Sequence, residues 1–175
     1  MRKTEILGLS AALALLVTAP LAAQQQKRVS PHETVSATVG GSKVTIEYGR
    51  PYLKGRQAVG GKLVPFNEVW RTGADEATLL TTEGDLMIGT VKVPAGSYSL
   101  FTLPTDAKHW TLIINKTAKQ WGAFNYDAKA DLGRTPMKVT APSSPVEQFT
   151  IQLTEGSLEL TWENTSASVP IKAAK

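Results

Sequence analysis

The sequence predicts an all-β fold: an antiparallel two-sheet sandwich or a jelly-roll-like domain of about ten short strands with two long irregular loops. Three observations lead to this prediction. Apolar side chains recur at every second position along most of the chain, turns rich in Gly and Pro separate these runs, and helical periodicity is almost absent. No internal repeat divides the chain, so we expect one domain.

The first pair of strands lies at "VSATVGGSKVTIEY". Val35 to Val39 alternates with polar residues, Gly40 and Gly41 supply a tight turn, and residues 44–48 alternate again. A period of two on both sides of a Gly-Gly pair indicates a hairpin, because glycine adopts the positive φ angles that a two-residue turn requires.

The middle of the chain predicts four more strands, at residues 77–82, 86–93, 97–104 and 109–116. The turn at 93–96 places Pro at its second position and Gly at its fourth, as a type I turn prefers. In the last of these strands Trp110, Leu112 and Ile114 share one face, while Ile113 is apolar on the other. We therefore expect this strand to be covered on both sides.

Two or three short strands close the chain. The apolar residues of 149–153 face those of 158–162 across a turn at Glu155-Gly156. The stretch 168–172 is predicted as an edge strand, because Pro170 has no N–H to donate to a neighbouring strand.

The first 23 residues have the layout of a secretory signal peptide. Arg2 and Lys3 precede an apolar run of about a dozen residues, and Ala22-Ala23 offers a cleavage point. The run is shorter than the roughly 20 residues that cross a bilayer, so no stable membrane anchor is expected. The predicted product is exported to the periplasm or the cell exterior, with a flexible lead-in at residues 24–34 and one domain at 35–172.

The composition excludes several classes of function. The chain has no Cys, which rules out disulfides, thiolate metal ligands and a cysteine nucleophile. Its 19 basic and 15 acidic side chains are interspersed, without the block of like charge that marks a nucleic-acid-binding tail. We therefore expect no nucleic-acid partner, and we predict no cofactor.

Sequence templates for catalysis and for metal binding are also missing. There is no G-x-S-x-G nucleophile elbow and no paired-histidine zinc motif. His32 falls in the lead-in and His109 at the start of a strand, which are poor positions for a catalytic triad. Asp127 and Asp131 have neither the Gly nor the Glu of a calcium loop. We predict no catalytic residue and no metal ligand.

The stretch "EVWRTGADEAT", at residues 68–78, leaves two interpretations open. In the structural one, Arg71 pairs with Asp75 or Glu76 and holds a turn, while Trp70 fills the interior. In the functional one, Arg71 offers its guanidinium to a carboxylate or phosphate of a ligand, with Trp70 as a stacking surface.

Two aperiodic stretches, residues 49–76 and 117–136, gather most of the charged and aromatic candidates. Loops at one end of a β scaffold can converge on a shared cleft, although the first stretch could equally be a solvated crossover. The candidate ligand-binding residues are Arg50, Arg56, Trp70, Arg71, Asp75, Glu76, Trp121 and Tyr126.

Three functions follow as hypotheses. The leading one is an exported binding module for a small anionic or sugar-like ligand. The first alternative is a hydrolase that acts on an envelope or extracellular substrate through Asp75, Glu76 or Asp127. The second is a structural or interaction domain of the cell envelope that holds a protein partner.

Five motifs occur in this order: "YGRPYLKGR", "LVPFNEVWRTGADEAT", "VPAGSYSLFTLP", "WTLIINK" and "QWGAFNY". With these motifs the chain resembles the secreted bacterial family catalogued as domain of unknown function 2911, over roughly residues 30–172. The resemblance implies an exported bacterial domain without an assigned activity, substrate or cofactor, and it supplies no catalytic residue. Asp75 stands where this family more often has Asn, which adds a charge to the loop.

Overall fold

The structure, a computed structural model, describes residues 28–175, and this part of the chain is all-β. In chain order the elements are β1 (His32–Val39), β2 (Ser42–Gly49), β3 (Thr78–Thr82), β4 (Leu86–Ile88), β5 (Val91–Val93), β6 (Gly96–Pro104), β7 (Trp110–Asn115), the 3₁₀ turn η1 (Ala128–Ala130), β8 (Asp131–Thr140), β9 (Val146–Leu153), β10 (Ser157–Glu163) and β11 (Thr165–Ala173). The predicted all-β class is confirmed, with eleven strands in place of about ten.

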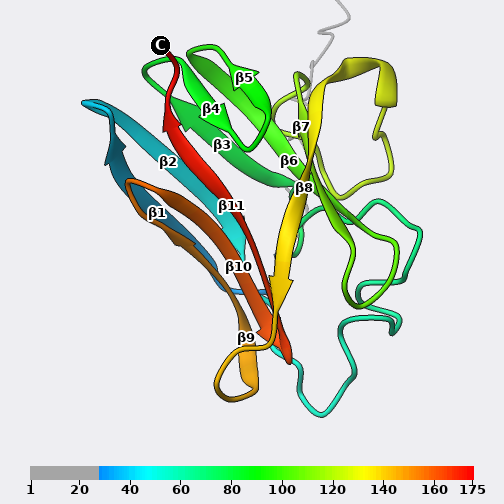
Figure 1. Cartoon of the computed structure of the whole chain (residues 1–175). Coiled ribbons are helices and arrows are strands. Elements are labelled where there is room, and N and C mark those ends of the chain that lie inside the picture. The colour runs from blue at the N-terminus through cyan, green and yellow to red at the C-terminus, as the bar shows by residue number, and fades with distance from the viewer. Residues whose placement is uncertain (1–27) are drawn as a thin grey trace, which may run out of the picture.

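The strands form one hydrogen-bonded sheet in which the neighbouring strands run antiparallel. Their order is β1-β2-β3-β6-β7-β8-β11-β10-β9, and the small β4–β5 hairpin attaches to β11. The sheet is nearly closed into a barrel, because β1 at one end contacts β9 at the other (Figure 1). The division into the two sheets of a sandwich or jelly roll stays a prediction.

The main core lies inside this curved sheet and consists of the alternating apolar side chains. The β1–β2 hairpin pairs Val39 with Ser42 across a turn in which Gly40 and Gly41 both have positive φ, as predicted. The β9–β10 hairpin keeps its predicted register from the turn to Thr161, and a bulge then shifts the register between Thr161 and Glu163. Burying each large aliphatic side chain contributes about 1.5–3 kcal/mol, so this interior dominates the stability of the fold.

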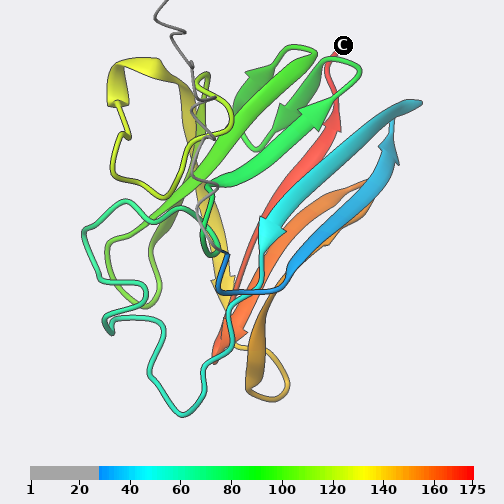
Figure 2. The same ribbon diagram turned by 180° about the vertical axis from the view of Figure 1, so that it is seen from behind.

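A second, smaller apolar cluster lies on the outer face of β6 and β7. Its centre is the pair Phe101 and Ile113, both fully buried, which confirms that the strand containing Ile113 is covered on both sides. The cover consists of residues from the two irregular stretches, among them Val69 and Tyr126. Both stretches lie along the same flank of the sheet in the two opposite views (Figures 1 and 2).

The single strand predicted at residues 86–93 is wrong, because the chain folds there into two short strands. β4 and β5 form a hairpin that turns at Gly89, whose φ is +56°. A Cβ at this position would lie 2.1 Å from the hydroxyl oxygen of Thr135, so only glycine fits the turn.

The predicted edge strand at 168–172 is also wrong, since it belongs to β11 in the interior of the sheet. β11 pairs with β10 on one side; on the other it pairs with β8 through residues 166–168 and with β4 through residues 171–173. Pro170 falls between these two partners, and its carbonyl faces β4, where it accepts a bond from Gly89. The missing N–H therefore lies where no ladder bond is needed.

The lead-in at residues 24–34 was predicted to be flexible, but its described residues are held by hydrogen bonds and by β1. β1 begins at His32, and Arg28 to Ser30 form hydrogen bonds to a distant loop. Residues 1–27, which include the predicted signal peptide, lie outside the described residues. Within residues 28–175 there is no helix with the length and apolar character needed to span a membrane.

Candidate functional site

The backbone of Trp70 pairs with β6 next to the point where β3 begins. Its backbone N–H and carbonyl exchange hydrogen bonds of 2.8 and 2.9 Å with Thr102, and its indole points into the main core. There it stacks on Trp162, with ring centroids 5.9 Å apart, and meets the edge of Phe149 at 5.1 Å. With 5% of its surface exposed, Trp70 is mainly a core residue, as the structural interpretation expected.

Arg71 follows in extended backbone, where successive side chains point to opposite faces, and it emerges on the outer side of the sheet. The next residue, Thr72, has a φ of +58°, a rare conformation for a β-branched residue. Its buried hydroxyl lies within hydrogen-bond distance of the carbonyl of Trp70, at 3.4 Å, and of the Thr102 hydroxyl, at 3.3 Å, and can donate its one hydrogen to either. The chain therefore turns away directly after Arg71, and the side chain is left at the edge of the turn.

The Arg71 guanidinium is half-buried and has no ion pair in the part of the chain that the structure describes. Its Nε is fully buried without a hydrogen-bond partner, the two terminal nitrogens stay accessible, and residues 28–175 offer it no ion pair within 4 Å. Burial lowers the pKa of Arg71, and the charge of Asp75 offsets part of this effect. The expected ion pair with Asp75 or Glu76 is therefore not formed in the described structure.

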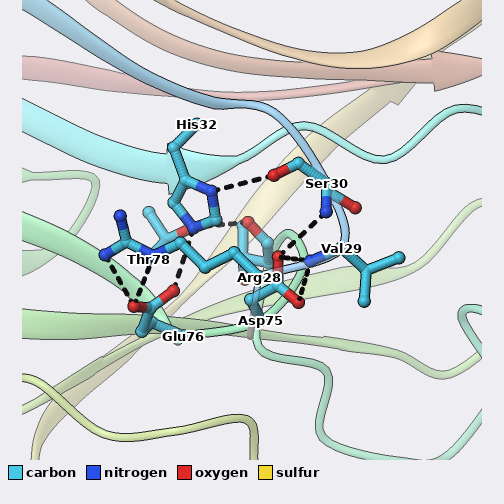
Figure 3. A network of polar contacts seen from close by, with 8 residues as sticks. Arg28, Val29, Ser30, His32, Asp75, Glu76 and Thr78 are labelled. Atoms are coloured by element: carbon cyan, nitrogen blue, oxygen red, sulfur yellow. Dashed lines mark hydrogen bonds and ion pairs between the residues drawn. The ribbon is translucent and has the colours of Figure 1, made fainter. Parts of the chain in front are cut away.

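Asp75 and Glu76 instead hold the segment that precedes β1 (Figure 3). Asp75 accepts hydrogen bonds from the backbone N–H groups of Val29 and Ser30 at 3.2 Å. Glu76 binds Arg28 at 2.7 Å through one oxygen and His32 at 2.9 Å through the other. We call residues 28–32 the N-terminal strap. Asp75 and Glu76, the two acids of the sequence motif, are therefore both occupied in holding this strap.

The two irregular stretches meet at these acids. Glu76 and Trp121 form an antiparallel bridge, Ala77 donates its N–H to Gln120 at 2.9 Å, and Gly122 donates to the carbonyl of Asp75 at 2.9 Å. The first stretch is thus joined, backbone to backbone, to the second, although about 45 residues separate them in sequence. The expectation that both would share one region is met by this junction.

A hollow of about 310 Å³ opens between the two stretches. The first stretch contributes apolar and charged groups and the second contributes Ala123 and Phe124. The residues that give the hollow its chemistry are Lys62, Leu63, Glu68, Val69, Arg71 and Phe124. Phe124 is 85% exposed, which is unusual for a large aromatic side chain. We call this space the Arg71 hollow.

A second hollow of about 350 Å³ lies near the strap, against β2 and β3. It is lined by Glu76, which is already paired with Arg28 and bonded to His32, and by Glu47 and Lys119. Both ring nitrogens of His32 face acceptors, Glu76 on one side and the carbonyl of Ser30 on the other. Both contacts are hydrogen bonds when the ring carries two protons.

The other predicted residues lie outside the Arg71 hollow. Arg50 pairs with Glu33 at 2.9 Å and donates to β9, on another side of the molecule. Arg56 donates to the carbonyls of its own loop, at Tyr52 and Leu53.

Tyr126 and Trp121 support the second stretch. The Tyr126 ring meets Phe101 at 5.0 Å, and its hydroxyl donates to Asp131 and accepts from Arg134. Burial and the bond to Asp131 raise the pKa of Tyr126 to about 12, so the phenol stays protonated. Trp121 is half-buried at the junction with Glu76.

The sequence did not single out Lys62, Glu68 and Phe124 as site residues. Phe124 carried a usable signal, because a lone phenylalanine between Ala123 and Asn125 in an aperiodic stretch has no strand face to bury it. Lys62 and Glu68 carried none. Among residues 28–175, no three His, Asp or Glu side chains are placed to share a metal ion.

Comparison with known proteins gives one match. No curated protein and no solved structure matches the chain. The model of a family described as "Protein of unknown function (DUF2911)" matches residues 30–171, which is most of the chain and nearly all of its described part. The chain therefore belongs to the DUF2911 family of proteins of unknown function.

Proposed function

We propose that this protein is an exported binding module that takes a small anionic ligand in the Arg71 hollow. One observation carries the proposal: the Arg71 guanidinium is half-buried, has no ion pair within residues 28–175, and opens onto a concave surface. Export is proposed from the first 23 residues of the sequence.

The energetics favour an anion at this place. Removing a cation from water costs free energy, and an ion pair inside the protein usually returns part of this cost. Arg71 lacks that compensation, because Asp75 acts on it only from a distance. A ligand carboxylate or phosphate could accept two hydrogen bonds from the accessible terminal nitrogens, in the bidentate geometry that guanidinium groups prefer.

The dimensions favour a small molecule. About 310 Å³ is at the lower end of the range of small-ligand pockets, which runs from roughly 300 to 1,000 Å³. The mixture of apolar walls with a few charged groups is also typical of such pockets.

The hydrolase alternative gains no support from the carboxylates on which it depends. Asp75 and Glu76 are occupied by the strap, and Asp127 caps η1 by accepting the N–H of Lys129. The envelope-scaffold alternative likewise has no specific observation in its favour.

A thermal-shift and calorimetric screen over organic acids, phosphates and neutral sugars tests the proposal. We expect at least one anion to bind the wild-type protein and to lose most of its affinity with Arg71→Gln. The matched control is Arg56→Gln, because Arg56 donates only to carbonyls of its own loop. Binding that survives Arg71→Gln, or that only neutral sugars show, would overturn the proposal.

A further inference from the structure

We propose that the ligand of the Arg71 hollow is a monocarboxylic acid that carries a single aromatic ring. This inference rests on the proposed function and specifies its ligand. It combines the charge balance of the hollow with the exposed ring of Phe124 and with the limited volume.

The charge balance favours a monoanion. Lys62 and Arg71 bring two positive charges to the lining, and Glu68 brings one negative charge. Asp75, which already acts on Arg71 electrostatically, adds a second negative charge nearby. A single carboxylate is paired by Arg71 alone, whereas a phosphate with nearly two charges would need Lys62 as well and would face the negative charges of Glu68 and Asp75.

One wall of the hollow includes an exposed aromatic ring. Phe124 lies so close to Gly122 that a Cβ on Gly122 would be 2.9 Å from the ring. Gly122 has a φ of +63°, which glycine adopts without strain. Most of the Phe124 ring faces solvent and is therefore available for stacking on a ligand ring.

The first stretch adds aliphatic side chains to the lining. Leu63, Pro65 and Val69 are half-buried along the first stretch and line the same hollow. A flat apolar group that enters between them and Phe124 removes apolar surface from water on both of its faces. With about 310 Å³ available, one ring and one acid group fit this space better than an extended chain or an oligosaccharide.

The position of Arg71 sets the orientation. Its Nε is buried, so the guanidinium can offer a ligand only its two terminal nitrogens. These form an end-on pair that matches the two oxygens of a planar carboxylate. The acid group then points towards the turn at Thr72, and the ring lies outwards against Phe124.

Calorimetry on the purified protein with benzoate, 3-phenylpropionate, acetate and inorganic phosphate tests the inference. We expect the aromatic acids to bind at least about tenfold more tightly than acetate, because the ring buries apolar area that acetate lacks. Phosphate should bind more weakly than benzoate, and Glu68→Gln should raise its affinity several-fold.

Two substitutions test whether Phe124 causes the preference for aromatic acids over acetate. Phe124→Ala should reduce the preference for benzoate over acetate to less than about threefold, while acetate binding persists. The control is Val29→Ala, which removes an apolar side chain that is 87% exposed and lies outside the hollow. Since Phe124 is exposed, its loss should leave the melting temperature unchanged, and this is checked for each variant.

The outcomes separate the two proposals. Equal affinity for acetate and benzoate, both lost with Arg71→Gln, would overturn the aromatic ligand and leave the anion site in place. A benzoate preference that survives Phe124→Ala would also overturn the inference. If none of the four probes binds through Arg71, both proposals are wrong for carboxylates and phosphate.

Discussion

Arg71 and Glu76 are five residues apart in one loop, yet their charges are used in opposite ways. Glu76 has two partners from the N-terminal strap, Arg28 and His32, and Asp75 beside it accepts two backbone N–H groups. Arg71 has no ion pair among the described residues, although its guanidinium is more buried than the carboxylate of Glu76. The acids therefore hold the loop, and the missing partner of Arg71 is the reason for proposing that its guanidinium binds a ligand.

Backbone geometry explains how neighbouring residues reach such different environments. Thr72 and Asp75 both adopt positive φ, at +58° and +64°, and the chain loops out after Trp70 before Thr78 resumes the pairing with β6. Asp75 tolerates this conformation better than most residues, while Thr72 does not. Strained residues of this kind cluster at functional sites, and here the strain lies next to the unpaired cation.

The largest effect on stability is expected for Asp75→Ala. This change removes the acceptor of two strap hydrogen bonds and places alanine at a positive φ, which should cost about 1.5–2 kcal/mol in the free energy of unfolding. Asp75→Asn keeps an acceptor and tolerates the conformation, so it should cost less than about 1 kcal/mol. Urea unfolding measures both; equal losses would show that the acid is not the anchor of the strap.

Arg71→Met should stabilise the unliganded protein by about 1 kcal/mol. The methionine keeps the aliphatic packing and removes a half-buried cation whose Nε has no partner. The same variant should lose ligand affinity, so stability and binding would change in opposite directions. A loss of stability as large as that of Asp75→Ala would mean that Arg71 is structural, and the contrast with Glu76 would disappear.

Glu76 predicts a dependence of stability on pH. Burial acts to raise its pKa and is the largest single effect, but the bonds from Arg28, the backbone and His32 outweigh it, so the pKa lies below its ordinary value of 4.5. Because the folded protein binds the proton less readily than the unfolded chain, Glu76 stabilises the fold above pH 4.5 and loses this contribution as the pH falls through its folded pKa.

Glu76→Gln should therefore be less stable than wild type at pH 7, and this difference should shrink below pH 4.5. The expected difference is under about 1 kcal/mol, because the carboxylate is partly exposed. Chemical unfolding at pH 7 and at pH 3.5 measures it. A constant difference at both values would contradict a role for the charge.

The smallest effect is expected for His32→Gln. Glutamine can still donate to Glu76 but cannot bridge Glu76 and Ser30 as the ring does, so about 0.5 kcal/mol should be lost. Hydrogen exchange at the first residues of β1 would register the loosened strap. If hydrogen exchange there does not change, while Asp75→Ala still loses the expected stability, then Asp75 alone holds the strap.

Most strands were predictable because their signal is local, but β8 (Asp131–Thr140) was missed, since residues 131–136 belong to a stretch that was predicted to be an irregular loop. Alternation identified the β1–β2 hairpin with its register and the β9–β10 hairpin as far as its bulge. The apolar Ile113 indicated a strand covered on both faces. Gly89 and Pro170 misled the prediction, because their effects depend on partners far away in sequence. Gly89 is needed where Thr135 approaches, and Pro170 is tolerated where β11 changes neighbours.

The candidate site was predictable only in part for the same reason. The motif around Arg71 was visible, and so was the possibility that two aperiodic stretches meet. The partners of Asp75 and Glu76 were not visible, because Arg28 and His32 lie more than 40 residues away in a segment without strand periodicity. Arg50 and Arg56 resembled Arg71 in sequence, and only the surrounding structure distinguishes a paired guanidinium from an unpaired one.

The place of β11 in the sheet has a consequence for how the chain folds. β11 lies between β10 and β8 and also carries the β4–β5 hairpin. Until residues 165–173 have emerged from the ribosome, β8 and β10 each keep an unpaired edge, because the strand that pairs with both of them is missing. The native sheet can therefore be completed only after β11 has been made, and a chain truncated before β11 should aggregate.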